Sequence, residues 1–326
     1  MNHEDTEARR NSPFFRTSCV RVFVVRLLSV TFFCGANLQS SYSQLAPSRP
    51  TQPPPLPRDT AFVEVAPDRV PTDGISEMGH IALAILPEKW KAAGTPNFHV
   101  HFRRATEAKK VVREIEYNLA FIAQQLSATP ESYAQKSHVY VFEDASEWAQ
   151  FLATANAPDW FGSFAFGDEL FLNVRGRDNQ GFDSHTLAHE TTHAVISRIY
   201  GTRRWPLWLN EGFAEYMGSA AVADRKNQTL KRNQRDLRAA DFSLEELLAL
   251  KKYPDEPLDI ARLYQTGEKF VRFLMSKGSP AQFVAFANAL VDSQPFDAAI
   301  ATNYPSQWPD PKKFEEDFTK YDGSKL

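Results

Sequence analysis

Apolar and polar residues alternate in several short stretches between residues 97 and 174. Residues 97–102, NFHVHF, place their apolar side chains on one side of an extended chain, which is the pattern of a strand with one buried face. Residues 138–142, HVYVF, predict a second strand. Residues 162–174 predict a hairpin or a bent edge strand, with Gly167-Asp168 near its turn.

The polar side of the first strand carries His99 and His101. Side chains two positions apart in a strand point the same way, so the two imidazoles are expected to lie together. Such a pair could form part of a metal site. The simpler interpretation, two histidines that face solvent, is favoured.

Apolar residues recur every three or four positions along most of the remaining sequence, which is typical of amphipathic helices. The longest early example is 106–126. Ser243 and Glu246 have the spacing of a capping box at the start of 242–250. Further helices are expected at 145–154, 260–277, 280–291, 296–300 and 312–321. The pattern predicts an α+β fold in which a small mixed-sheet lobe precedes a mainly helical lobe.

The N-terminal residues 1–43 have the character of a targeting segment. Five arginines precede the uncharged run 27–38, LLSVTFFCGANL. This run is too short to span a bilayer comfortably but suits the core of a signal peptide. Cleavage after Ser43 would give a secreted or periplasmic protein. An uncleaved membrane anchor, with the folded domain outside the cytoplasm, and a cytosolic protein are the alternatives.

Composition sets the domain organisation. Residues 44–78 are rich in proline, which predicts an extended linker without a core. The folded domain is then expected at 79–326, with the α+β lobe at 79–182 and the helical lobe at 183–326. The chain is 43% hydrophobic, enough for a packed core, and its formal charge of −3 excludes a strongly basic nucleic-acid binder. Both cysteines lie in 1–43, so histidines and carboxylates are the strong metal ligands available downstream.

The sequence 187–193, LAHETTH, contains two histidines four positions apart, with a glutamate directly after the first. Residues four apart lie on one face of a helix, so His189 and His193 can bind one metal ion. Glu190 then lies beside the ion, where a carboxylate can take a proton from an activated water. The plain alternative is an amphipathic helix with two surface histidines.

A catalytic zinc ion takes three protein ligands and keeps one position open. Seventeen residues separate His193 from Glu211. That length allows the first helix to end, a loop to turn back, and a second helix to begin with Pro206 in its first turn. Glu211 is then expected to point toward the histidines as the third ligand. Glu215, one turn later, is expected to accept the other N–H of a ligand histidine.

His185 lies one turn before His189 and invites assignment as a ligand. Three ligands from consecutive turns of one straight helix cannot converge on a tetrahedral ion, because the outer two lie about 11 Å apart. His185 is therefore expected near the cleft or at the helix start, and not on the metal.

The combination of HETTH with LNEGFAEY at 209–216 resembles the gluzincin metallopeptidases, most closely the peptidase-MA-like domains related to the aminopeptidase N family. The gap between the two segments is one residue shorter than is usual in that aminopeptidase family. The resemblance covers about 95–320. It implies a zincin-like fold and one Zn²⁺ per chain, held by His189, His193 and Glu211, with Glu190 as the general base.

A third segment, 263–270, LYQTGEKF, resembles the Tyr-x-x-Gly start of a later helix in the same superfamily. The resemblance implies that Tyr264 donates a hydrogen bond to the substrate carbonyl oxygen as it gains negative charge. A buried helix tyrosine is the alternative. The resemblance also implies that the strand within 162–174 lies beside the active-site cleft and pairs with extended substrate.

These features predict zinc-dependent hydrolysis of peptide bonds in a protein or peptide substrate. The segment that captures a free amino terminus in the aminopeptidase N family is not found, which favours an endopeptidase. The protein is expected to be a monomer that binds no nucleic acid and meets a membrane only through an uncleaved anchor. Two other functions stay open: a catalytically silent envelope binding protein on the same fold, and a zinc hydrolase of a non-peptide substrate.

Overall fold

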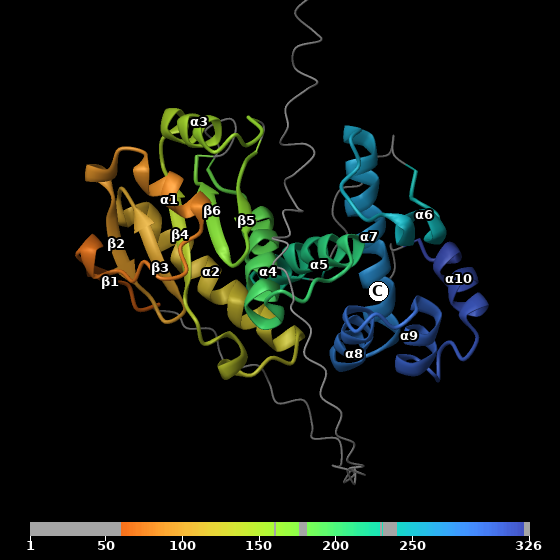
Figure 1. Cartoon of the computed structure of the whole chain (residues 1–326). Helices are drawn as coiled ribbons and strands as arrows, with labels where there is room; N and C mark the ends of the chain where they lie inside the picture. Colours follow the sequence, from red (N-terminus) through yellow and green to blue (C-terminus); the bar gives the residue numbers. More distant parts are fainter. Residues whose placement is uncertain (1–59, 160, 176–180, 229, 231–239, 323–326) are drawn as a thin grey trace, which may run out of the picture. The chain divides into compact units, whose positions relative to one another are not determined.

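A mixed β-sheet forms the first lobe of the computed structural model (Figure 1). The described residues are 60–159, 161–175, 181–228, 230 and 240–322. The strands among them are β1 (Val63–Val65), β2 (Lys91–Gly94), β3 (Phe98–Phe102), β4 (Ser137–Phe142), β5 (Phe164–Phe166) and β6 (Glu169–Asn173). Their order across the sheet is β1-β2-β3-β4-β6-β5. The three strands β3, β4 and β6 are parallel, and the others pair antiparallel.

Helices cover both faces of this sheet. The side chains of Val139 and Val141 on β4 join one core with α2 (Ala105–Gln125) and α4 (Ser184–Tyr200). Their neighbours on β4 point to the opposite face, as the strand period requires. There α3 (Ala145–Thr154) packs Trp148 edge-to-face and Phe151 stacked against Phe142, and α1 (Glu77–Ala84) lies against the same strand. Short 3-10 turns occur at Pro67–Arg69, Pro87–Lys89 and Pro130–Tyr133.

The second lobe is helical, so the predicted α+β order of a mixed-sheet lobe followed by a helical lobe is confirmed. Beyond α4 it contains α5 (Leu207–Arg225), α6 (Leu244–Ala249), α7 (Pro257–Lys277), α8 (Pro280–Val291), α9 (Phe296–Asn303) and α10 (Pro311–Lys320). The capping box of Ser243 and Glu246 is present at the start of α6. Helix α5 packs against both α4 and α7 (Figure 1). Within the described residues, no helix combines the length and apolar character needed to cross a membrane.

The N-terminal part of the folded unit begins earlier than its proline content indicated. Residues 63–65, inside the stretch expected to be a linker, form the edge strand β1 and pair with β2. Prolines flank this short strand, as an edge strand tolerates. The remaining linker residues 44–59 and the targeting segment 1–43 lie outside the described residues.

The expectation that both strand histidines face solvent is wrong for His101, which is 4% exposed. Its Nε2 lies 3.1 Å from Nδ1 of His138 on the neighbouring strand, and its ring stacks on Tyr140. Tyr140 in turn donates a hydrogen bond to Glu169. The N-terminal segment buries this face, because the hydroxyl of Tyr140 and the carboxylate of Glu169 pack against the bare Cα of Gly79 on α1.

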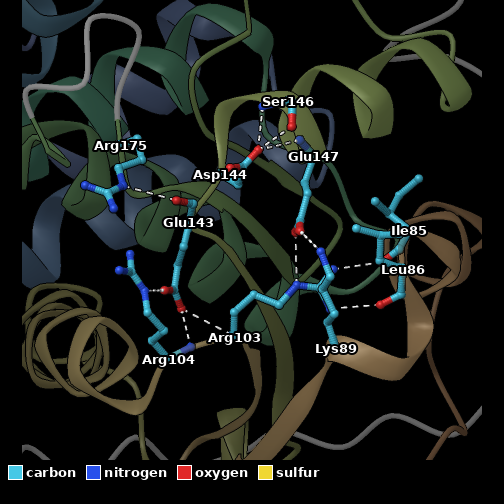
Figure 2. A network of polar contacts seen from close by, with 10 residues as sticks. All are labelled: Ile85, Leu86, Lys89, Arg103, Arg104, Glu143, Asp144, Ser146, Glu147 and Arg175. Atoms are coloured by element: carbon cyan, nitrogen blue, oxygen red, sulfur yellow. Dashed lines mark hydrogen bonds and ion pairs between the residues drawn. The ribbon is translucent and has the colours of Figure 1, made fainter.

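A polar network fastens the N-terminal segment to the carboxyl ends of the parallel strands (Figure 2). Arg103, after β3, pairs with Glu147 on α3 at 3.0 Å and donates to the carbonyl of Ile85 at 2.8 Å. Its guanidinium lies 3.7 Å from the ring centre of Trp90. Arg104 pairs with the buried Glu143 after β4. Because these charges are paired and mostly shielded from water, they hold the layers in register rather than form a free site.

The buried histidine pair predicts that acid destabilises the fold. Burial and the charge of His138 lower the pKa of His101 to about 3, and burial lowers the pKa of His138 to about 4. Below pH 6.5 an unfolded chain binds protons on both rings, whereas the folded protein excludes them until about pH 4. The free energy of unfolding should therefore fall from pH 6.5 to pH 4, by roughly 1 kcal/mol per pH unit for each histidine.

Denaturant unfolding across this pH range measures the slope. The double variant His101→Phe/His138→Phe keeps ring packing and removes both titrating groups, so its slope should be shallower. His80→Gln on α1, an exposed position, is the control and should keep the wild-type slope. A double variant as acid-sensitive as wild type would assign the effect to other groups.

Candidate metal centre

Two helices bring the separate sequence motifs together. Asp183 caps α4 by accepting the N–H of Thr186 at 2.9 Å, and α4 then runs through both histidines. Pro206 is the N-cap residue of α5, with φ −50° and ψ 141°, rather than a residue of its first turn. Its carbonyl accepts the N–H of Asn210 at 2.9 Å, so the first helical hydrogen bonds start there. Glu211 follows as the fifth residue of α5.

Three donor atoms converge between α4 and α5. Nε2 of His189 lies 3.0 Å from Nε2 of His193. Oε2 of Glu211 lies 3.5 Å from the first nitrogen and 3.4 Å from the second. Donors on a tetrahedral zinc ion, at bond lengths of about 2.0–2.1 Å, are about 3.3 Å apart. The predicted ligand residues thus form a group that could hold a metal ion, the one such group found in the described part of the chain.

The carboxylate of Glu211 gives a second reason to place a cation here. Glu211 is 2% exposed, and its Oε2 has no hydrogen-bond partner among the described residues. A buried anionic oxygen without a donor is costly. A divalent cation among the three donors would provide this oxygen with a partner. Zinc binds imidazole nitrogen and carboxylate oxygen donors of this kind.

The surrounding charges favour a cation as well. Burial alone would lower the pKa of His189, but Glu211 and Glu215 raise it well above its usual value. Burial alone would raise the pKa of Glu211, but the two imidazoles hold it well below its usual range. The carboxylates therefore create a negative site around two imidazoles, where positive charge is stabilised.

Each imidazole has a polar side chain next to its Nδ1, the ring nitrogen that does not face the other ring. Nδ1 of His189 lies 3.0 Å from Oε1 of Glu215, so Glu215 lies where it was expected, on the side of the ring away from Nε2. Nδ2 of the Asn210 side-chain amide lies 3.0 Å from Nδ1 of His193. Rotation of this amide by half a turn would place its oxygen there to accept the Nδ1–H, and His193 would then keep the lone pair of Nε2 for a metal. Asn210 was not singled out in the sequence, although it directly precedes the third ligand.

Glu190 connects the metal-binding helix to the sheet. Its Oε2 accepts the backbone N–H of Ala165 on β5 at 2.8 Å. Burial raises the pKa of this carboxyl above its ordinary value of 4.5, although both ligand histidines oppose the shift. The hairpin predicted at 162–174 is present, with Gly167 at its turn at φ +64°. The sheet edge and the candidate base are therefore held together by one hydrogen bond.

Tyr264 lies in the same region, on α7, with its ring centre 6.0 Å from that of His189. A close helix crossing sets its position. A Cβ on Gly212 would lie 2.4 Å from the backbone carbonyl of Gly267, and a Cβ on Gly267 would lie 2.8 Å from the carbonyl oxygen of Trp208. Backbone thus touches backbone where α5 meets α7, one residue after Glu211 and three after Tyr264.

His185 lies outside the ligand group, as expected. Its Nε2 lies 3.5 Å from Oε2 of Glu215, so this carboxylate lies between His185 and His189. The His185 ring packs against Gly218, where a Cβ would meet it at 2.8 Å. His185 therefore contacts the carboxylate behind His189 and lies outside the group that could hold a metal ion.

Tyr253 is a further residue of the site that the sequence did not indicate. It follows α6 in the connection to α7, and its hydroxyl donates to Oε1 of Glu211 at 2.5 Å. Nothing in the local sequence marks it, because the two residues are 42 positions apart and a tyrosine in a polar connection has no characteristic spacing.

Comparison with protein-family models finds no matching family, and comparison with curated proteins finds no similar sequence. The assignment of His189, His193 and Glu211 as a metal-binding group therefore rests on their geometry and chemistry.

The glycine contact between α5 and α7 predicts a large effect of one added methyl group. Gly212→Ala should lower the free energy of unfolding by about 1–3 kcal/mol, because overpacking forces the two helices apart. It should also weaken zinc binding, since Glu211 moves with α5. Denaturant unfolding and zinc titration measure both effects. Gly94→Ala is the control, because a Cβ there meets nothing within 4 Å; equal behaviour of the two variants would contradict the close crossing.

The orienting carboxylate predicts a graded loss of metal affinity. Glu215→Ala should weaken zinc binding about 10–100-fold, as is typical when the partner of a ligand histidine is removed. Glu215→Gln should lose less, because its amide oxygen still accepts the Nδ1–H of His189. Competition with a chromophoric chelator measures the affinity. The exposed Glu245→Gln on α6 controls for the lost charge, and wild-type affinity in Glu215→Ala would refute the orienting role.

Proposed function

We propose that this protein is a zinc metallopeptidase that hydrolyses internal peptide bonds of a protein or peptide substrate. The observation that carries the proposal is the buried group of His189, His193 and Glu211, with Glu190 fixed beside it. A zinc ion bound by this group would supply Lewis-acid chemistry, polarising a carbonyl and acidifying a water.

Glu190 is the general base of the proposed reaction. Its position next to His189 on α4 lets it take a proton from the attacking water and pass that proton to the leaving amine. The hydrogen bond from the N–H of Ala165 occupies Oε2, which fixes the carboxylate and leaves Oε1 for the water. Among the carboxylates around the imidazoles, Glu211 is the proposed ligand, Glu190 is the proposed base, and Glu215 lies behind His189.

Tyr264 is proposed to donate a hydrogen bond to the substrate carbonyl oxygen as that oxygen gains negative charge. Its ring extends from α7 and forms a T-shaped pair with the ring of His189. The close contact of Gly212 with Gly267 supports this role, because it holds the helix of the tyrosine against the helix of the ligand.

Strand β5 is proposed to bind the substrate backbone. It is the last strand in the sheet order, so one of its sides has no strand neighbour within the described residues. An extended peptide added there would lie beside Glu190 and run along the sheet edge. This arrangement suits cleavage within a chain, and supports an endopeptidase.

The decisive variant is Glu190→Gln, which removes the base and keeps the shape. Cleavage of a mixed peptide library should fall by at least about 100-fold, the usual contribution of a positioned base. Elemental analysis should still find one zinc per chain, because the three ligands are untouched. Glu245→Gln serves as the surface control and should cleave like wild type.

Two outcomes would refute the peptidase. Zinc-loaded wild type that cleaves no peptide would favour a silent binding protein or a hydrolase of non-peptide substrates. Wild type that takes up no zinc would remove the ligand assignment itself. The proposed place of action, outside the cytoplasm, rests on the pattern of residues 1–43; recovery of the full-length chain only in the cytosolic fraction of expressing cells would refute it.

A further inference from the structure

The two oxygens of Glu211 have different surroundings. Oε1 accepts a hydrogen bond from the hydroxyl of Tyr253, with 2.5 Å between the oxygens. Oε2 faces Nε2 of His189 and of His193, at 3.5 and 3.4 Å, and has no hydrogen-bond partner among the described residues. A carboxylate in free solution presents two equivalent oxygens. In Glu211 they differ, because Oε1 is hydrogen-bonded and Oε2 is available to a metal ion.

From this difference we propose that Tyr253 is a positioning residue, which holds Glu211 as a ligand that offers only Oε2 to the metal. The inference rests on the proposed metal site and specifies how one of its ligands binds. Carboxylates bind metal ions through one oxygen or through both. The hydrogen bond from Tyr253 directs Oε1 away from the two imidazoles, and a charge-assisted hydrogen bond in a buried site opposes rotation of Oε1 toward an ion.

Binding through one oxygen has a chemical consequence. The protein then supplies three donor atoms, which is the number that leaves a fourth position open on a catalytic zinc ion. If Glu211 turned both oxygens to the ion, the additional donor would compete with water or substrate for that position. Tyr253 therefore acts on the open position without lying in it, through the orientation of Glu211.

Tyr304 provides a matched control for the loss of a tyrosine hydroxyl. It is fully buried in the C-terminal helices, where it packs against Phe286 and Trp308. Its hydroxyl has no hydrogen-bond partner in the described part of the chain. Tyr304→Phe thus removes the same atom from a buried ring, far along the chain from the metal-binding helices.

The test compares wild type, Tyr253→Phe and Tyr304→Phe, each as the full chain, loaded with Co²⁺ as a spectroscopic probe. Four-coordinate Co²⁺ absorbs more strongly in the visible region than five-coordinate Co²⁺. Tyr253→Phe should show weaker visible bands than wild type, because Oε1 is released to the ion. Its zinc affinity should fall about tenfold or more, as for other losses of a hydrogen bond to a ligand. Tyr304→Phe should match wild type in both measurements, and circular dichroism should show all three chains folded.

A Tyr253→Phe spectrum identical to wild type would overturn the proposal, whatever the zinc affinity. Wild type that binds neither Co²⁺ nor Zn²⁺ would overturn the metal site together with the role of Tyr253. Wild type that binds metal but cleaves no peptide would refute only the peptidase, because the cobalt spectra report on Glu211 without any turnover.

Discussion

A buried carboxylate is the constraint on which this structure depends. Removing the charge of Glu211 from water costs several kcal/mol, and the side chain is 2% exposed. The fold places two imidazoles near one oxygen, which has no hydrogen-bond partner among the described residues, and a tyrosine hydroxyl donates to the other. These partners come from α4 and from the connection between α6 and α7. The burial of Glu211 is therefore tolerable only when α4 and this connection are packed against it.

The contact of Gly212 with Gly267 makes that assembly possible. The two helix backbones touch there, so any side chain at either position would move α5 away from α7. Glu211 and Tyr264 lie one and three residues from these glycines. The sequence NEG and the sequence YxxG thus each combine a reactive side chain with the glycine that positions it. These two short sequences therefore specify both helix packing and candidate chemistry. The geometry of the site and the stability of the helical lobe depend on the same residues.

The parts of the site that lie on single helices could be predicted, because helical spacing alone places His189, Glu190 and His193 on adjoining faces. The strands β3 and β4, the hairpin of β5 and β6, and the capping box followed from local patterns in the same way, whereas β1 and β2 were not predicted. Tyr253 could not be found, since its contact with Glu211 depends on how a connection folds back over 42 positions. His101 was misjudged for a related reason. Its surroundings include β2 and α1. The chain that forms this part of the fold begins within the proline-rich stretch 44–78, for which an extended linker was expected.

Helix α4 unites the two lobes, because each of its faces has a different partner. Leu187 and Val195 join the core beneath the sheet, whereas His189 and His193 face Glu211 on α5. Glu190 occupies the boundary between these faces, where the N–H of Ala165 reaches it from the sheet edge. A shift of β5 would therefore move the candidate base, and a shift of α5 would move a ligand. The candidate reactive side chains all lie on helices of the second lobe. The site still needs both lobes, because the sheet contributes the N–H of Ala165 that fixes the candidate base.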